Sequence, residues 1–181
     1  MEKYALSKST FIRGLQCKKK LYLYKHHYNL KDNISPQSQA IFNQGNKVGI
    51  LAQDLFPNGA DASPSSHFKI QESVVKTKEF IENGETIIYE ATFQFNGVLV
   101  ALDVLVKQKD GWKAYEVKSS TKVSDTYIKD AAIQYYTIIN CGINLKDISI
   151  VHINKQYIKD GDINIQKLFT IESVSNRIQE I

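Results

Sequence analysis

The sequence predicts one α/β domain over residues 1–181, and the change of apolar period along the chain is the first observation behind this prediction. Residues 1–83 follow a mainly helical period, whereas residues 84–171 carry strand patterns with one helix between them. The second observation is a pair of turn dipeptides, Asn96-Gly97 and Asp110-Gly111, which join three strands into a meander. The third is composition: 43% apolar and 23% charged residues are usual for a globular domain.

Composition also limits the compartment and the partners. No apolar run reaches the roughly 18 residues that a membrane-spanning helix needs, and the N-terminus lacks the apolar core of a signal peptide. The cysteines are Cys17 and Cys141 alone, too few for a disulfide framework. We therefore expect a cytoplasmic protein with no membrane partner.

Three helices are expected before the sheet. Ser7 or Ser9 can cap the first, which runs to about His27. The second helix, the loop that follows it and the third helix are predicted at residues 37–56, 57–66 and 69–82. Gly45 and Gly49 inside the second helix each cost about 1 kcal/mol relative to Ala, which favours a close approach or a break there.

Strands dominate the second half of the chain. They are predicted at residues 86–95, 98–107, 112–118, 147–154 and, more weakly, 163–171. Ser124 caps a helix that runs to about Cys141 and ends at Gly142. The tail at residues 172–181 has a helical pattern, and a natural end and a truncation of a longer helix both stay open.

The two turns of the meander determine which residues face each other. A two-residue turn at the first dipeptide places Glu90 opposite Asp103. At the second dipeptide, a two-residue turn places Asp103 opposite Lys118, and a four-residue turn places Asp103 opposite Glu116; both registers stay open. In either register Asp103, Glu116 and Lys118 share one face within roughly 4.5–8 Å.

This cluster of charged residues indicates a cation site. Asp103 lies in the apolar run at residues 98–106, where a carboxylate is costly unless it is paired or bound to a metal. Three carboxylates against one lysine leave surplus negative charge, and oxygen ligands favour Mg²⁺ or Mn²⁺ over zinc. The alternative is a structural salt bridge of Lys118 with Asp103 or Glu116, which leaves the surplus carboxylates unexplained.

The N-terminal segment is basic. Its lysines and arginine up to residue 30 are Lys3, Lys8, Arg13, Lys18, Lys19, Lys20 and Lys25. Tyrosines lie among these cations, a pattern that suits contact with a phosphate backbone. Arg13, Lys18 and Lys19 are the candidates for nucleic-acid contacts, and a solvated helix face is the alternative.

Asp103, a gap of twelve residues and then Glu116-Val117-Lys118 resemble the motif of the PD-(D/E)XK nuclease superfamily. The flanking segments resemble its RecB-like branch, related to the CRISPR-associated adaptation exonucleases, and an uncharacterised bacterial domain family assigned to the superfamily. These segments are LSKSTFIRGLQCKKKLYLYKH, GNKVGILAQDLFP, YEATFQFNGVLVALDVLV, YEVKSS and AIQYYTIINCG, within residues 6–155. The resemblance implies a restriction-endonuclease-like core, with a mixed central sheet flanked by helices and additional N-terminal helices.

The resemblance also implies a role for each residue of the cluster. Asp103, Glu116 and the Val117 carbonyl would hold the divalent metal, and Glu90 could be a further ligand. Lys118 would orient or deprotonate the attacking water and stabilise charge on the scissile phosphate.

Two further positions follow the cluster along the chain. The resemblance implies that Gln134 lies beside the site and contacts the substrate or Lys118, with Tyr135 or Tyr136 packing nearby. Ser119 either supplies a hydroxyl to a phosphate or simply ends the strand.

The chain departs from the family pattern in three places. Leu102, not proline, precedes Asp103. Gly49 stands where many RecB-like enzymes carry a metal-binding histidine, four residues after Gly45, so one metal ligand is missing. Cys17 matches the first of the four cysteines of iron–sulfur members, but the other three are absent. We expect no iron–sulfur cluster in this chain, although a protein partner or a larger parent polypeptide could supply the missing ligands.

The resemblance implies a divalent-metal-dependent deoxyribonuclease, with an exonuclease of DNA repair, recombination or phage and CRISPR defence as its expected form. One alternative is a catalytically weak or inactive nucleic-acid-binding module on the same fold, which the absent histidine favours. Another is a structural fragment whose function lies beyond residue 181. DNA and RNA, and exonucleolytic and endonucleolytic cleavage, stay open as alternatives.

Overall fold

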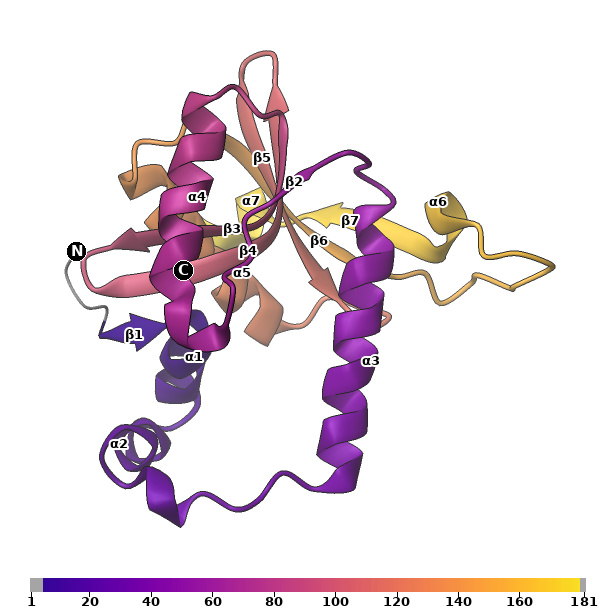
Figure 1. Cartoon of the computed structure of the whole chain (residues 1–181). Coiled ribbons are helices and arrows are strands. Elements are labelled where there is room, and N and C mark those ends of the chain that lie inside the picture. Colours follow the sequence, from indigo (N-terminus) through magenta and orange to yellow (C-terminus); the bar gives the residue numbers. More distant parts are fainter. Residues whose placement is uncertain (1–4, 180–181) are drawn as a thin grey trace.

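A mixed β-sheet is the frame of the computed structural model, which describes residues 5–179. Its seven strands are arranged in the order β2-β3-β4-β5-β6-β7, with β1 paired to β4. Helices lie around the sheet, and α2 and the first half of α3 project from it (Figure 1). The predicted α/β class, with a mixed central sheet, flanking helices and additional N-terminal helices, is confirmed.

Three consecutive strands form the antiparallel meander. They are β3 (Ile87–Phe95), β4 (Val98–Gln108) and β5 (Gly111–Lys118). The first turn is Asn96-Gly97, and both of its residues have the positive φ that Asn and Gly tolerate. Because Phe95 pairs with Val98, the register predicted for β3 and β4 is confirmed on both sides of Glu90.

The second turn lies one residue earlier than predicted. Gln108 pairs with Gly111, so Lys109-Asp110 forms the turn and the prediction of a two-residue turn at Asp110-Gly111 is wrong. Gly111 is the first residue of β5, and a Cβ atom there would lie 2.5 Å from the Asn144 carbonyl oxygen, so the close approach favours glycine at this position. The resulting register is the predicted one that places Asp103 toward Glu116.

The other half of the sheet follows the meander. The helix α5 (Asp125–Asn140) leads from β5 to β6 (Leu145–Ile153), which is parallel to β5. Two short strands complete the sheet: β1 (Leu6–Ser7) is parallel to β4, and β2 (Ala60–Asp61) is parallel to β3.

The first predicted helix is two helices, so the prediction of one continuous helix to His27 is wrong. They are α1 (Lys8–Gln16), with the predicted cap at Ser7, and α2 (Lys18–His26), followed by the short 3₁₀ helix η1 (Tyr28–Leu30). Cys17 between them has an extended backbone. This break lets α2 fold back, so that Gly14 lies against Leu21 and the Arg13 guanidinium lies over the Tyr24 ring.

The second and third predicted helices are α3 (Pro36–Gln53) and α4 (Ile70–Glu82), and the 3₁₀ helix η2 (His67–Lys69) precedes α4. The break or close approach predicted at Gly45 and Gly49 is wrong. The helix is continuous, and a Cβ atom at either glycine would meet nothing within 4 Å.

The C-terminal segment differs from its prediction. The weak strand predicted at residues 163–171 is confirmed only at residues 169–171, within β7 (Phe169–Ser173). Its earlier part is wrong, because the chain there forms α6 (Ile165–Leu168), which Asn164 caps. The last helix, α7 (Ser175–Ile178), begins later than predicted because Glu172 and Ser173 pair with β6. Residues 180–181 of the predicted tail helix lie outside the described residues.

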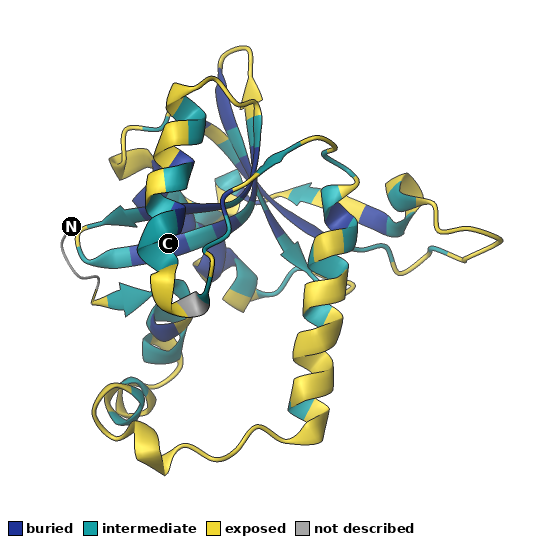
Figure 2. Cartoon of the chain, in the orientation of Figure 1, coloured by how far each residue is buried: buried dark blue, intermediate teal, exposed yellow. Residues whose placement is uncertain are grey.

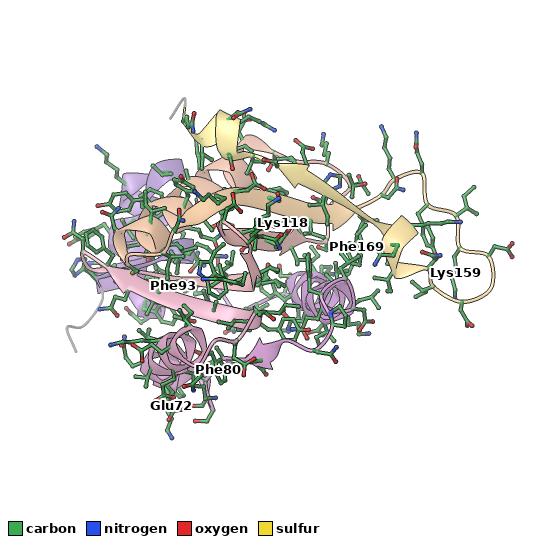
Figure 3. All side chains as sticks on the ribbon, turned by 90° about the horizontal axis from the view of Figure 1, so that it is seen from above. Glu72, Phe80, Phe93, Lys118, Lys159 and Phe169 are labelled. Atoms are coloured by element: carbon green, nitrogen blue, oxygen red, sulfur yellow. The ribbon has the colours of Figure 1, made fainter. Side chains whose placement is uncertain are left out.

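Apolar side chains pack on both faces of the sheet. Ala114 packs with residues of α4 and α5, whereas Tyr115 and Val117 pack with residues of α3. Buried residues are concentrated in the central strands, and α2 and the first half of α3 are largely exposed (Figure 2). Figure 3 shows that Phe93 and Lys118 lie within the body of the molecule, while Lys159 lies on the projecting loop before α6.

None of the helices within residues 5–179 is both long enough and apolar enough to cross a membrane.

Gly45 offers a test of how α3 is built. Gly45→Ala should raise the free energy of unfolding by about 0.5–1 kcal/mol, because Ala favours the helix and its Cβ enters open space. The control is Gly84→Ala, which also meets no atom within 4 Å but must adopt a φ of +85°. We expect this control to lower stability in the same urea titration; equal effects of the two substitutions would contradict the assigned backbone conformations.

Candidate metal and phosphate site

The predicted charged cluster surrounds one cavity of about 520 Å³. The sheet and the adjoining segment contribute Glu90, Asp103, Glu116, Val117, Lys118 and Ser119, α3 contributes Gly45, Asn46, Gly49, Ile50 and Gln53, and α5 contributes Tyr127. The structure therefore brings together the four charged residues that the register arguments placed on one patch.

The cavity lies where two neighbouring strands separate. The last pair between β4 and β5 is Val104 with Tyr115. Beyond it, Glu116, Val117 and Lys118 of β5 pair only with β6. The Val117 N–H donates to Asp103 Oδ2 at 2.5 Å in place of a backbone carbonyl. This hydrogen bond fixes the carboxylate at the point where β4 and β5 separate, which we call the fork.

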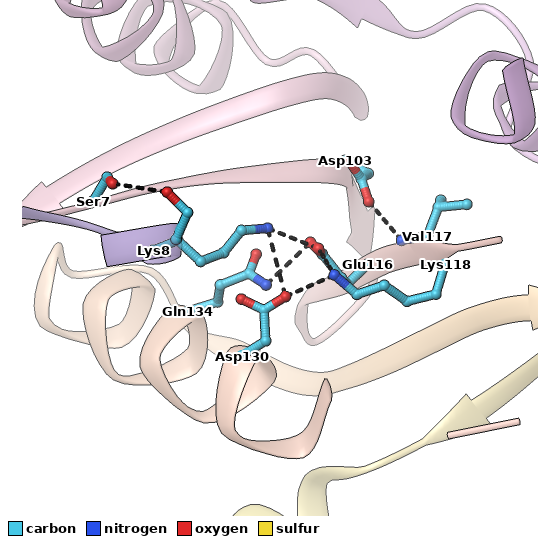
Figure 4. A network of polar contacts seen from close by, with 9 residues as sticks. Ser7, Lys8, Asp103, Glu116, Val117, Lys118, Asp130 and Gln134 are labelled. Carbon is cyan, nitrogen blue, oxygen red and sulfur yellow. Dashed lines mark hydrogen bonds and ion pairs between the residues drawn. The ribbon is translucent and has the colours of Figure 1, made fainter. Parts of the chain in front are cut away.

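Glu116 is the centre of the polar contacts in Figure 4. It is 2% exposed, and its Oε1 accepts from Lys8 Nζ at 2.7 Å and from Lys118 Nζ at 2.6 Å. Its Oε2 accepts from Gln134 Nε2 at 3.0 Å. Lys118 also donates to Asp130 Oδ2 at 2.7 Å. Of the pairs predicted for Lys118 as a structural salt bridge, the structure has the one with Glu116.

Glu116 and Asp103 have opposite pKa shifts. Burial acts to raise the pKa of Glu116, but the ammonium groups of Lys8 and Lys118 outweigh burial and lower it to about 2. Burial and the nearby charge of Glu116 raise the pKa of Asp103 to about 8. Burial and Glu116 likewise raise the pKa of Glu90. At neutral pH, Glu116 is therefore ionised, whereas Asp103 keeps its proton unless another cation approaches.

Lys118 is held as a cation. Burial acts to lower its pKa, but the charges of Glu116 and Asp130 outweigh burial and raise it above the ordinary lysine value. The same two carboxylates outweigh burial at Lys8 and raise its pKa as well. Both ammonium groups are therefore charged across the physiological range.

The oxygen donors at the fork fit a magnesium-type ion only in part. Among residues 5–179, no three His, Cys, Asp or Glu residues are grouped closely enough to hold a metal together. Mg²⁺, however, is commonly held by one or two carboxylates with several waters and substrate oxygens. Asp103, Glu116 and Val117 all line the cavity, so two carboxylates with the Val117 carbonyl match that smaller donor set.

Two residues of the cluster, the buried Asp130 and the partly buried Lys8, were not identified from the sequence. Asp130 precedes Gln134 by four residues on α5, so the helical period could have placed both on one face. Lys8 gave no comparable signal, because its position depends on the short strand β1, which pairs with β4. Oδ1 of Asp130 and Oε1 of Gln134 are buried without a hydrogen-bond partner among the described residues.

The remaining predicted site residues lie at different distances from the cavity. Ser119 lines it, and Gln134 is fully buried behind Glu116. Tyr135 packs against the hydrophobic core, and the ring of Tyr136 contacts Phe95, so neither tyrosine lines the cavity.

The predicted nucleic-acid contacts Arg13, Lys18 and Lys19 lie on α1 and α2. Arg13 and Lys19 line a surface cavity between these helices and η1, and Lys18 is exposed.

The chain was compared with known proteins. No protein-family model matches it, and a search of curated proteins finds no significant match.

The raised pKa of Asp103 gives a test by stability. The unfolded chain releases this proton near pH 3.8, whereas the folded protein keeps it to about pH 8, so stability should fall as pH rises between these values. Asp103→Asn removes this loss. In thermal unfolding with EDTA, we expect the melting temperature of the variant to exceed that of the unsubstituted protein by a margin that grows from pH 4 to pH 8. A margin independent of pH would contradict the assigned protonation.

Proposed function

We propose that the chain is a divalent-metal-dependent nuclease that hydrolyses the phosphodiester bonds of DNA, with Mg²⁺ or Mn²⁺ as its metal. The observation that carries this proposal is the fork between β4 and β5, where Asp103, Glu116 and Lys118 line one cavity. An exonuclease of DNA repair, recombination or phage and CRISPR defence is the form that the family resemblance favours.

The carboxylate side of the cavity is suited to a divalent cation. Asp103 and Glu116, with the Val117 carbonyl, would hold the ion, and Glu90 lies close enough to the same cavity to add an oxygen. A bound divalent ion polarises a phosphate and lowers the pKa of a bound water. The raised pKa of Asp103 supports this assignment, because a carboxylate fixed in such a place becomes ionised when a cation binds it.

Lys118 is better suited to stabilising negative charge than to taking a proton from water. Its pKa is raised, so it carries no lone pair for that proton at neutral pH. Its ammonium group is held by Glu116 and Asp130 at 2.6 and 2.7 Å and faces the cavity from the end of β5. A cation fixed in this way can compensate the charge that develops on a phosphate during cleavage.

Lys8 and Gln134 act as positioning residues in this proposal. They hold the two oxygens of Glu116, one from the start of α1 and one from the middle of α5. Fixing both oxygens leaves the carboxylate in one orientation toward the cavity, which is the arrangement that a preorganised ligand requires.

A nucleic-acid-binding module without cleavage is the second candidate. It is favoured by the two lysines that already compensate Glu116, and by the lack of a three-residue ligand group within residues 5–179. Metal titration separates the two candidates, because a module without catalysis has no need to bind Mn²⁺ at Asp103.

The nuclease proposal is tested with labelled single- and double-stranded DNA and RNA in Mg²⁺ or Mn²⁺. Asp103→Ala and Lys118→Gln should each lower the cleavage rate by about 100-fold or more, because the first removes a proposed metal ligand and the second a fixed cation. The control is Lys167→Gln, an exposed lysine on α6. Cleavage at an unchanged rate by either site variant, with circular dichroism confirming a folded chain, would contradict the proposal.

A further inference from the structure

A second cavity of about 420 Å³ adjoins the cavity that Glu90, Asp103 and Glu116 line, which we call the carboxylate cavity. It lies between α1, the start of α2 and the start of α5, and the two cavities share Lys118 and Tyr127. The carboxylate cavity carries three carboxylates against one lysine, whereas the second is lined by four cations, Lys8, Arg13, Lys20 and Lys118, and by Asp130. A cavity rich in carboxyl groups and a cavity rich in cations therefore meet at Lys118.

Two of these four cations are not neutralised by a carboxylate within residues 5–179. Lys8 and Lys118 form ion pairs with Glu116 and Asp130. Lys20 only donates to the Gln16 side chain, and Arg13 lies over the Tyr24 ring. Positive charge therefore remains for a ligand at this cavity.

Arg13 provides a second observation that points to an anionic ligand. Its Nε is buried and has no hydrogen-bond partner among the described residues. A buried guanidinium donor without an acceptor is costly, and a phosphate oxygen is the acceptor that a guanidinium binds best.

The start of α5 also faces this cavity. Ser124 is its N-cap residue, but the Ser124 side chain makes no capping hydrogen bond. Thr126 and Tyr127 in the first turn line the cavity. The N-terminus of this 16-residue helix adds partial positive charge to the four cations.

We propose that this second cavity binds a phosphate of the nucleic-acid strand, next along the strand from the phosphate in the carboxylate cavity. The assignment of this phosphate to a nucleic-acid strand rests on the proposed nuclease function. Lys118, on the shared wall, lies between the two phosphates, and the Tyr127 ring, 5.2 Å from Lys118 Nζ, offers a surface on which a base or sugar can pack. The cavity thereby sets the position of the strand relative to the bond that is cut.

The proposal is tested by binding of a short fluorescent oligothymidylate to the full chain in EDTA, where no metal-dependent cleavage occurs. Lys20→Gln and Arg13→Gln should each weaken binding by about 5- to 10-fold at 50 mM salt. Each should also reduce the slope of log affinity against log salt by about 0.7, the value for one single-strand phosphate contact. Inorganic phosphate at millimolar concentration should compete with the oligonucleotide in the unsubstituted protein and less well in these variants.

Lys129→Gln is the matched control, since Lys129 is exposed on α5 and lines neither cavity. Lys20 makes no contact that the fold requires, so its variant tests the site even if Arg13→Gln disturbs the packing of α1 on α2. Binding of both variants as tight as that of the unsubstituted protein, or an equal loss in Lys129→Gln, would overturn the proposal.

This binding experiment and the cleavage assay in Mg²⁺ or Mn²⁺ together separate the phosphate site from the nuclease proposal. If Lys20→Gln loses oligonucleotide binding while the unsubstituted protein cuts no substrate in Mg²⁺ or Mn²⁺, the phosphate site is supported and the nuclease proposal is contradicted. Metal-dependent cleavage with unchanged binding in both variants overturns the phosphate site alone.

Discussion

The separation of β5 from β4 is the constraint on which the rest of the site depends. The two strands pair as far as Val104 and Tyr115, and then β5 continues beside β6 alone. This leaves the Val117 N–H for the Asp103 carboxylate and opens a cavity between the fork and α3. On the other edge of the fork, β1 pairs with the start of β4 and delivers Lys8 from the first residue of α1 to Glu116. Sheet topology, rather than any loop, therefore positions the charged groups.

Two carboxylates on neighbouring strands consequently have different environments. Glu116 is surrounded by donors from three elements and is ionised, whereas Asp103 has one backbone donor and a pKa near 8. The two carboxyl groups therefore differ in protonation state at neutral pH. Lys8 and Lys118 form ion pairs with Glu116, whereas Asp103 forms no ion pair with a lysine or arginine of residues 5–179. Lys8 and Lys118 also line the second, basic cavity, so a carboxylate-rich cavity and a cluster of cations lie side by side.

Elements that depend on neighbouring residues in the sequence, such as the first tight turn, were predicted correctly. Asn96-Gly97 fixed the first hairpin and thereby the relation of Glu90 to Asp103. For the second hairpin the sequence allows two registers, because the role of Gly111 depends on its contact with Asn144, which is distant in sequence. The position of Lys8 beside Glu116 could not be predicted from the sequence for the same reason, because only the pairing of β1 with β4 brings Lys8 there. The break at Cys17 and the late start of α7 likewise follow from tertiary packing, which a periodic pattern does not contain.

The central claim is that the fork binds a divalent cation at a carboxyl group that gives up its proton. Calorimetric titration of Mn²⁺ into the metal-free protein at pH 7, in two buffers with different ionisation enthalpies, tests it most directly. The account predicts binding with release of close to one proton per ion, because the pKa of Asp103 is about 8 before the ion binds. It also predicts loss of this binding in Glu116→Gln. No binding of Mn²⁺, or binding without proton release that Asp103→Asn leaves unchanged, would contradict the account.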